Sequence, residues 1–186
     1  MGLEIGGKRL GLLHELLPGS VRFAVLVDPN TQFFLADPII KQVQNAASTI
    51  GAQIEVLTAA TIREIDAAFA NLVQKRADAL LVSPDALFRN RRVQLTTLAT
   101  RHIVPTMYDE RQFVEAGGLM SYGAIRADQY RQIGIYTGRI LKGEKPADLP
   151  VMQATKFEFV INLQTARTLG IEVPPALLAI ADEVIE

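Results

Sequence analysis

The sequence predicts an α/β fold, a Rossmann-like three-layer sandwich with a mainly parallel sheet. Two short apolar runs, 23–27 and 78–82, each lead straight into a polar turn. Such runs are too short for helices and are typical of strands buried on both faces. Helical patterns separate the apolar runs along most of the chain. Alternation of this kind indicates parallel strands joined by right-handed crossovers.

From the first helix onward, predicted helices and strands alternate along the chain as far as residue 142. A loop, a strand and two helices follow. Apolar spacing, capping residues and Pro or Gly stops predict helices at 8–17, 38–50, 61–73, 84–101, 110–116, 128–142, 163–169 and from 175. Short apolar or alternating runs predict strands at 23–27, 53–58, 78–82, 103–107, 119–123 and 156–161. Residues 144–150 are rich in Pro and charge and are expected to be a loop.

Composition narrows the class of protein. The chain has 186 residues, 49% hydrophobic and 21% charged, with a net charge of −1 and no cysteine. A packed core is therefore expected, whereas disulfides and thiolate metal sites are excluded. The even charge balance argues against nucleic acid as a partner. No apolar run is long enough to span a membrane.

The expected domain organisation is a single lobe over 8–186, preceded by a linker or chain start over 1–7. The first residues lack the apolar stretch of a signal peptide, so the chain as given is expected to stay in the cytoplasm.

Polar residues gather where the predicted strands end. They are found in 28–31, at Thr58, and in 83–85, 108–110 and 121–123. In an open parallel sheet, ligands bind outside the carboxyl ends of the strands. Carboxylates, hydroxyls and two tyrosines at one such edge suit a hydrogen-bonded small organic ligand.

Catalytic signatures are missing from the sequence. It contains no G-x-G-x-x-G, P-loop or G-x-S-x-G motif, and its two histidines, His14 and His102, suggest no catalytic or metal pair. We therefore expect neither an enzyme nor a bound cofactor or metal. An alternative from another class is a stand-alone flavodoxin-like enzyme or receiver domain using Asp28 and Asp85. The basic run 89–92 is expected to be a solvated helix face.

Several strings resemble the ABC-transporter substrate-binding proteins of the tryptophan/tyrosine-binding type. They cover nearly the whole chain and are 8–10, 16–19, 121–123, 138–150, 156–163 and 166–171. The resemblance implies a type I periplasmic-binding-protein lobe, equivalent to the C-terminal lobe of a two-lobe protein. It also implies an ABC permease as partner and a periplasmic location.

The resemblance and the strand ends together give the expected ligand-binding residues. These are Asn30, Thr31, Ser83, Asp85, Tyr108, Glu110, Ser121 and Tyr122. The expected ligand is of aromatic, carboxylate or amino-acid type. Amino-acid-binding members carry an Asp two residues after the Tyr-Gly, but here Ala124 and Ile125 follow Tyr122-Gly123.

The same resemblance predicts that segment 126–142 packs on the missing first lobe or on a partner. Ile133, Tyr136 and Ile140 would form the contact face. A homodimer, with a second copy covering this face, is the expected form of the isolated chain.

Overall fold

A computed structural model describes residues 5–30, 36–151 and 155–186, which form a seven-stranded sheet in the order β2-β1-β3-β4-β5-β6-β7. The strands are β1 (Arg22–Val27), β2 (Gln53–Thr58), β3 (Ala79–Val82), β4 (Thr106–Tyr108), β5 (Met120–Ala124), β6 (Phe157–Asn162) and β7 (Glu183–Ile185). Neighbouring strands run parallel except β5 and β6, which are antiparallel. The predicted mainly parallel α/β fold is confirmed.

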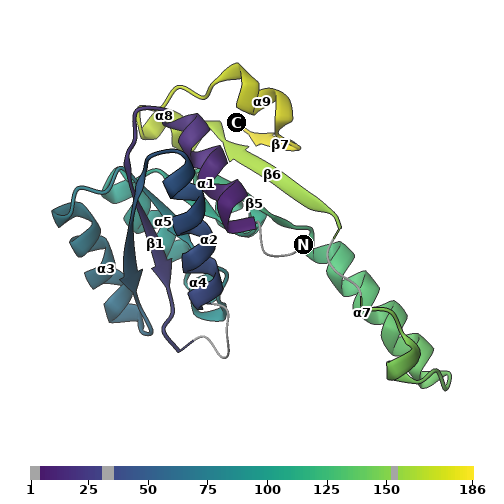
Figure 1. The fold of residues 1–186 in the computed structure, drawn as a ribbon. Helices are drawn as coiled ribbons and strands as arrows, with labels where there is room; N and C mark the ends of the chain where they lie inside the picture. Colours follow the sequence, from purple (N-terminus) through teal and green to yellow (C-terminus); the bar gives the residue numbers. More distant parts are fainter. Residues whose placement is uncertain (1–4, 31–35, 152–154) are drawn as a thin grey trace.

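Helices cover both faces of the sheet, which gives the three layers (Figure 1). They are α1 (Ile5–Leu16), α2 (Ala36–Thr49), α3 (Ile62–Gln74), α4 (Ala86–Asn90), α5 (Arg92–Arg101), α6 (Arg111–Glu115), α7 (Arg126–Leu141), the 3₁₀ helix η1 (Pro146–Asp148), α8 (Leu163–Thr168) and α9 (Pro175–Ile180). Buried side chains of α1, α2, α8 and α9 join one core cluster. Those of α3, α4, α5 and α6 join the cluster on the other face.

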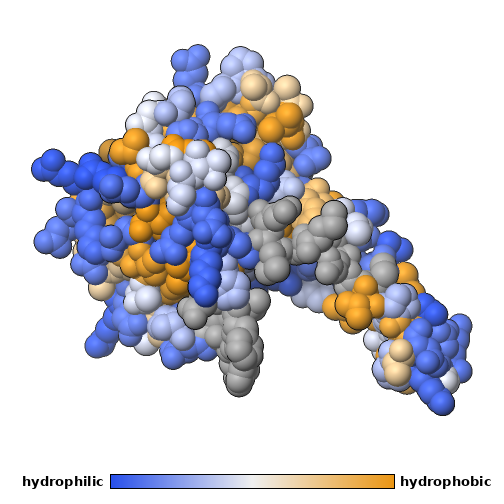
Figure 2. Space-filling view, in the orientation of Figure 1, coloured by the Kyte–Doolittle hydropathy of each residue, from blue (hydrophilic) through white to orange (hydrophobic). Residues whose placement is uncertain are grey.

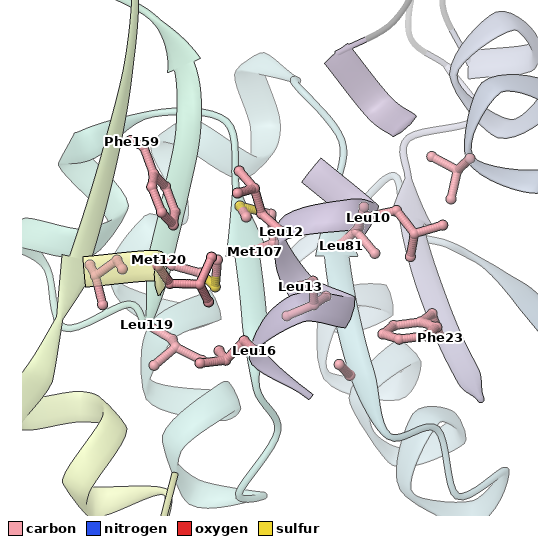
Figure 3. Close-up of a cluster of buried hydrophobic side chains, with 14 of the residues drawn as sticks. Leu10, Leu12, Leu13, Leu16, Phe23, Leu81, Met107, Leu119, Met120 and Phe159 are labelled. Atoms are coloured by element: carbon pink, nitrogen blue, oxygen red, sulfur yellow. The ribbon is translucent and has the colours of Figure 1, made fainter. Parts of the chain in front are cut away.

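Helix α1 is a central element of the first cluster. Its Leu10, Leu12, Leu13 and Leu16 are buried against the sheet, close to Phe23, Met107 and Met120 (Figure 3). Leucines three and four residues apart share one helical face, so this packing follows from the sequence pattern. Burying each such side chain contributes about 1.5–3 kcal/mol.

Helix α7 departs from this layered arrangement. It follows β5 and precedes β6 in the chain, and it projects away from the sheet (Figure 1). Apolar side chains gather on its visible surface (Figure 2). None of its 16 residues is buried, and Ile133 is 59% exposed. An isolated helix of this length is marginal in water, because most helix stability in proteins comes from packing of an apolar face.

One predicted helix and one predicted strand need correction. The single helix expected up to residue 101 is two helices, α4 and α5, joined at Arg91, whose backbone (φ −109°, ψ 21°) is not helical. Helix α4 is capped by Asp85, whose side chain accepts a hydrogen bond from the Leu87 N–H, so the helix begins two residues later than the predicted residue 84. The strand expected at 103–107 begins only at Thr106, since Ile103 has a φ of 55° and ends the turn after α5.

The last strand, β7, has no counterpart in the sequence prediction. Its three residues follow a short helix and carry too little pattern to separate them from a loop. β7 extends the sheet beside β6 in parallel register.

The ends of β4 and β5 approach closely at Gly123. A Cβ atom added there would lie 1.8 Å from the Asp109 carbonyl oxygen, a backbone atom that has no flexible side chain to move away. Only glycine therefore allows these two strand ends to sit together.

We expect Gly123→Ala to lower the free energy of unfolding by at least about 2 kcal/mol, because the strand ends must separate. Chemical denaturation followed by circular dichroism measures this change. Gly138→Ala is the control, since an added Cβ meets no atom within 4 Å inside α7 and alanine favours a helix by about 0.5–1 kcal/mol. Equal stability of Gly123→Ala and the parent would contradict the close approach.

Candidate functional site

The strand order defines where a ligand would bind. The chain passes from β1 to β2 on one side and then returns to β3 on the other side of β1. In open α/β sheets this switch point is where ligands bind, outside the carboxyl ends of the strands. We call the residues at these ends, 28–30, 83–85, 108–110 and 121–124, the carboxyl edge.

The turns after β1 and β3 are ordered by their own aspartates. Asp28 Oδ1 accepts a hydrogen bond of 2.8 Å from the Asn30 N–H, and Asp85 Oδ1 accepts one of 2.6 Å from the Leu87 N–H. Asn30 is exposed, and Ser83 is buried at the end of β3. Thr31, also predicted to bind ligand, lies outside the described residues.

Two predicted ligand-binding side chains are buried beneath the carboxyl edge. Tyr108 is fully buried, and its ring stacks on Phe113 with the centroids 4.6 Å apart. The expectation of an apolar contact between Tyr108 and a ligand is therefore corrected, because this ring belongs to the core. Burial also raises the pKa of its phenol. Ser121 is 1% exposed, and its Oγ has no hydrogen-bond partner among the described residues.

Tyr122 lies on the opposite face of β5 and is half-buried. Its ring stacks on Phe157 of β6, with centroids 5.8 Å apart. Its backbone carbonyl accepts a hydrogen bond of 2.7 Å from Arg9 Nε. In this structure its ring thus contacts a neighbouring strand, while its backbone fixes the position of Arg9.

Arg9 is a buried charge, only 7% exposed although it belongs to α1. Burial lowers its pKa, while the nearby Asp109 and Glu110 carboxylates act in the opposite direction. A guanidinium remains protonated in proteins, so Arg9 keeps a positive charge under the carboxyl edge. A buried charge of this kind requires an opposite charge close by.

Asp109 is the buried carboxylate that interacts electrostatically with Arg9. It is 6% exposed, and its Oδ1 is buried with no hydrogen-bond partner in the described part of the chain. Burial raises its pKa to about 6, and Glu110 adds to the rise, whereas Arg9 and Arg89 oppose it. A carboxyl group with such a shifted pKa, at the ends of the strands, marks a candidate functional residue.

Glu110 connects two further arginines. Its Oε1 accepts a hydrogen bond from Arg126 Nη2 at the start of α7 and lies 3.5 Å from Arg89 Nη1 of α4. Arg89 Nη1 also lies 3.8 Å from Asp109 Oδ2. The carboxyl edge therefore carries two adjacent carboxylates that are surrounded by three guanidiniums.

Arg9, Arg89 and Arg126 are not among the ligand-binding residues predicted from the sequence. Arg9 did leave a signal, since it shares a helical face with Leu12, Leu13 and Leu16 and a charge on a buried face needs a partner. Arg89 was expected on a solvated face, but it turns toward the strand ends. The position of Arg126 depends on how α7 leaves β5, which no local pattern encodes.

The described surface has two relevant hollows. A groove of about 630 Å³ runs along α7 and the segment 146–151, with Ile133, Tyr136 and Ile140 in its lining. A smaller hollow of about 310 Å³ lies at the carboxyl edge beside Glu110, Arg126 and Ile125. The larger groove lies on the projecting helix, away from the strand ends, so its size does not make it the better ligand site.

The described residues contain neither a cluster suited to a metal ion nor a membrane-spanning helix. No group of three His, Asp or Glu side chains there is arranged to hold a metal ion. None of the described helices combines the length and apolar character that crossing a membrane requires.

Solved structures with this fold include several substrate-binding proteins. A conserved domain protein from Vibrio cholerae is 24% identical, with a TM-score of 0.88, over 96% of this chain and 60% of that one. An ABC domain in complex with L-Trp from Streptococcus pneumonia is 24% identical, with a TM-score of 0.87, over 97% and 62%. The chain thus spans about 60% of the length of these proteins.

A third solved structure is a ligand-free, open substrate-binding protein with adhesive properties from Clostridium difficile. It is 24% identical, with a TM-score of 0.68, over 96% of this chain and 59% of that one. A comparison with curated proteins gave no match.

The open α/β sheet of this chain is the fold that these solved structures share. The family model for ABC transporter substrate binding proteins matches residues 4–185. The chain therefore belongs to the ABC transporter substrate-binding protein family.

The raised pKa of Asp109 predicts how the free energy of unfolding changes with pH. The folded state holds this proton more tightly than the unfolded chain, so this group lowers the free energy of unfolding as pH rises from about 4 to about 6. Asp109→Asn should remove the effect. Its stability relative to the parent should rise by about 2–3 kcal/mol across this window and level off above it.

Urea unfolding at a series of pH values measures this difference, and Asp148→Asn, on the exposed η1, is the control. A carboxyl ¹³C signal of Asp109 that titrates near pH 4 would contradict the shifted pKa.

Proposed function

We propose that this chain is a solute-binding component of an ABC importer that binds a small organic ligand at the carboxyl edge without catalysis. Family membership supports the binding role. The observation that carries the location is the set of buried charges at the ends of β4 and β5. Within the described part of the chain, Asp109 Oδ1 and Ser121 Oγ are buried there without a hydrogen-bond partner. Such atoms are rare in native structures because they lower stability, and a binding role would explain them.

The ligand is proposed to be of aromatic, carboxylate or amino-acid type. One solved structure with this fold contains L-Trp, which supports such a ligand but belongs to a protein only 24% identical. Asn30, Asp85 and Glu110 supply hydrogen-bonding groups at the edge. An ABC permease would be the partner, and the periplasm the place of action, as the family suggests.

The rival hypothesis uses Asp28 and Asp85 as magnesium ligands in a receiver or flavodoxin-like enzyme. Each aspartate already accepts a hydrogen bond from a backbone amide two residues further on. This local use explains why aspartate occurs at both turns. It favours the binding proposal over the rival.

Ligand binding can be tested by NMR on the ¹⁵N-labelled chain, titrated with aromatic amino acids and aromatic carboxylates at millimolar concentration. We expect the amide signals of Asn30, Asp85 and Glu110 to shift, while that of Lys75, at the end of α3, stays in place. Glu110→Gln should weaken the effect, whereas Glu172→Gln, at an exposed position between α8 and α9, should not. A saturable response to Mg²⁺ that Asp28→Ala abolishes, with no response to organic compounds, would favour the rival.

Helix α7 is proposed as an interface rather than a ligand site. Ile133, Ile140 and Leu141 are exposed by 59%, 41% and 83%. The groove on this helix is lined mainly by apolar side chains, and water contact with such a surface is unfavourable. We propose that a second copy covers this face in the isolated chain.

Light scattering after size-exclusion chromatography should give a dimer for the parent chain. The double substitution Ile133→Glu and Ile140→Glu should give a monomer, because charges cannot be buried unpaired in the contact. Val93→Glu, which alters an equally exposed side chain on α5, should leave the dimer intact. A monomeric parent with α7 helical in solution would rule out the interface.

A further inference from the structure

Two guanidiniums share one carboxylate oxygen at the carboxyl edge. Arg126 Nη2 donates to Glu110 Oε1, and Arg89 Nη1 lies 3.5 Å from the same atom. The two arginines come from different elements, α7 and α4. Their convergence on a single oxygen brings the donor groups of both side chains to the same place.

Arg89 is poorly satisfied in this arrangement. Its contacts with Glu110 and Asp109, at 3.5 and 3.8 Å, are longer than the 2.7–3.2 Å usual for an N–H···O hydrogen bond. Its guanidinium donates no hydrogen bond within residues 5–30, 36–151 and 155–186. A guanidinium has five N–H donors in a fixed fork, so most of the donor capacity of Arg89 is unused. Its side chain is 32% exposed and can meet a ligand.

The charged side chains next to Glu110 Oε1 include more cations than anions. Arg9, Arg89 and Arg126 face Asp109 and Glu110, which is three positive charges against two negative ones. Glu115 and Glu158, which line the hollow beside Glu110, both pair with Arg111, at 2.8 and 3.3 Å. Asp28 and Asp85, further along the edge, each accept a hydrogen bond from a backbone amide at Oδ1. A carboxylate entering beside Glu110 would therefore meet donors instead of an uncompensated acidic patch.

We propose that Arg89 and Arg126 form the receptor for a carboxylate group on the ligand. This inference rests on the proposed solute-binding function and names its ligand class, an organic acid. The planar fork of arginine matches a carboxylate in a bidentate arrangement. The hollow beside Arg126 has Ala124, Ile125 and Ala127 in its wall, which offer apolar contact for the rest of a small acid. Its lining also includes charged side chains, namely Glu110, Arg111, Glu115 and Glu158.

The test compares phenylacetate with phenylacetamide, which has nearly the same shape but no charge. Both are titrated into the ¹⁵N-labelled chain at pH 7.5 and constant ionic strength, and the side-chain Nε–H signals of arginine are followed. We expect phenylacetate, and not phenylacetamide, to shift the signals of Arg89 and Arg126. Arg89→Gln and Arg126→Gln should each raise the dissociation constant about ten-fold or more, because a charged hydrogen bond is lost.

Two variants separate binding from a general structural effect. Arg89→Lys keeps the charge but loses the fork, so its affinity should fall between those of the parent and Arg89→Gln. Arg131→Gln removes an exposed arginine of α7 that pairs with Asp128, away from Glu110, and should leave affinity unchanged.

The outcomes distinguish this inference from the function on which it rests. Equal shifts of the edge amides by acid and amide would keep the edge as a binding site but overturn the carboxylate receptor. Unchanged affinity in both glutamine variants would also overturn it. If no organic compound shifts any edge amide of the folded chain, both the receptor and the proposed function fail.

Discussion

The position of Arg9 is the constraint on which the carboxyl edge depends. A helix that otherwise buries leucines carries this guanidinium under the strand ends, where it donates to the Tyr122 carbonyl at 2.7 Å. The same charge faces Asp109, whose backbone carbonyl is pressed against Gly123. One side chain thus links α1, β4 and β5 at the point where the chain leaves the sheet for α7.

Charge, rather than shape, distinguishes this edge from an ordinary set of loops. Removing water from Asp109 and Arg9 has a large unfavourable free energy, which their mutual attraction only partly offsets. Replacing such a pair by apolar side chains is often neutral or stabilising, so stability alone does not explain it. The proposed binding function at the strand ends would account for it, because binding sites commonly retain buried charges that a stable core would not need.

Much of the fold could be predicted from the sequence because local patterns encode it. The strand runs and the capping box at Thr61 each act over a few residues. The buried position of Tyr108 and the turn of Arg89 toward Glu110 could not be predicted in this way. They depend on which elements pack beside each strand end, and a tyrosine or an arginine after a strand is compatible with either a core or a surface position.

The crystal structure of the chain grown with the tightest-binding compound of the ligand panel tests the central claim most directly. The account predicts electron density for that compound at the carboxyl edge, in contact with the turns 28–30 and 83–85 and with Glu110. Density confined to the groove along α7, with the carboxyl edge empty, would contradict it.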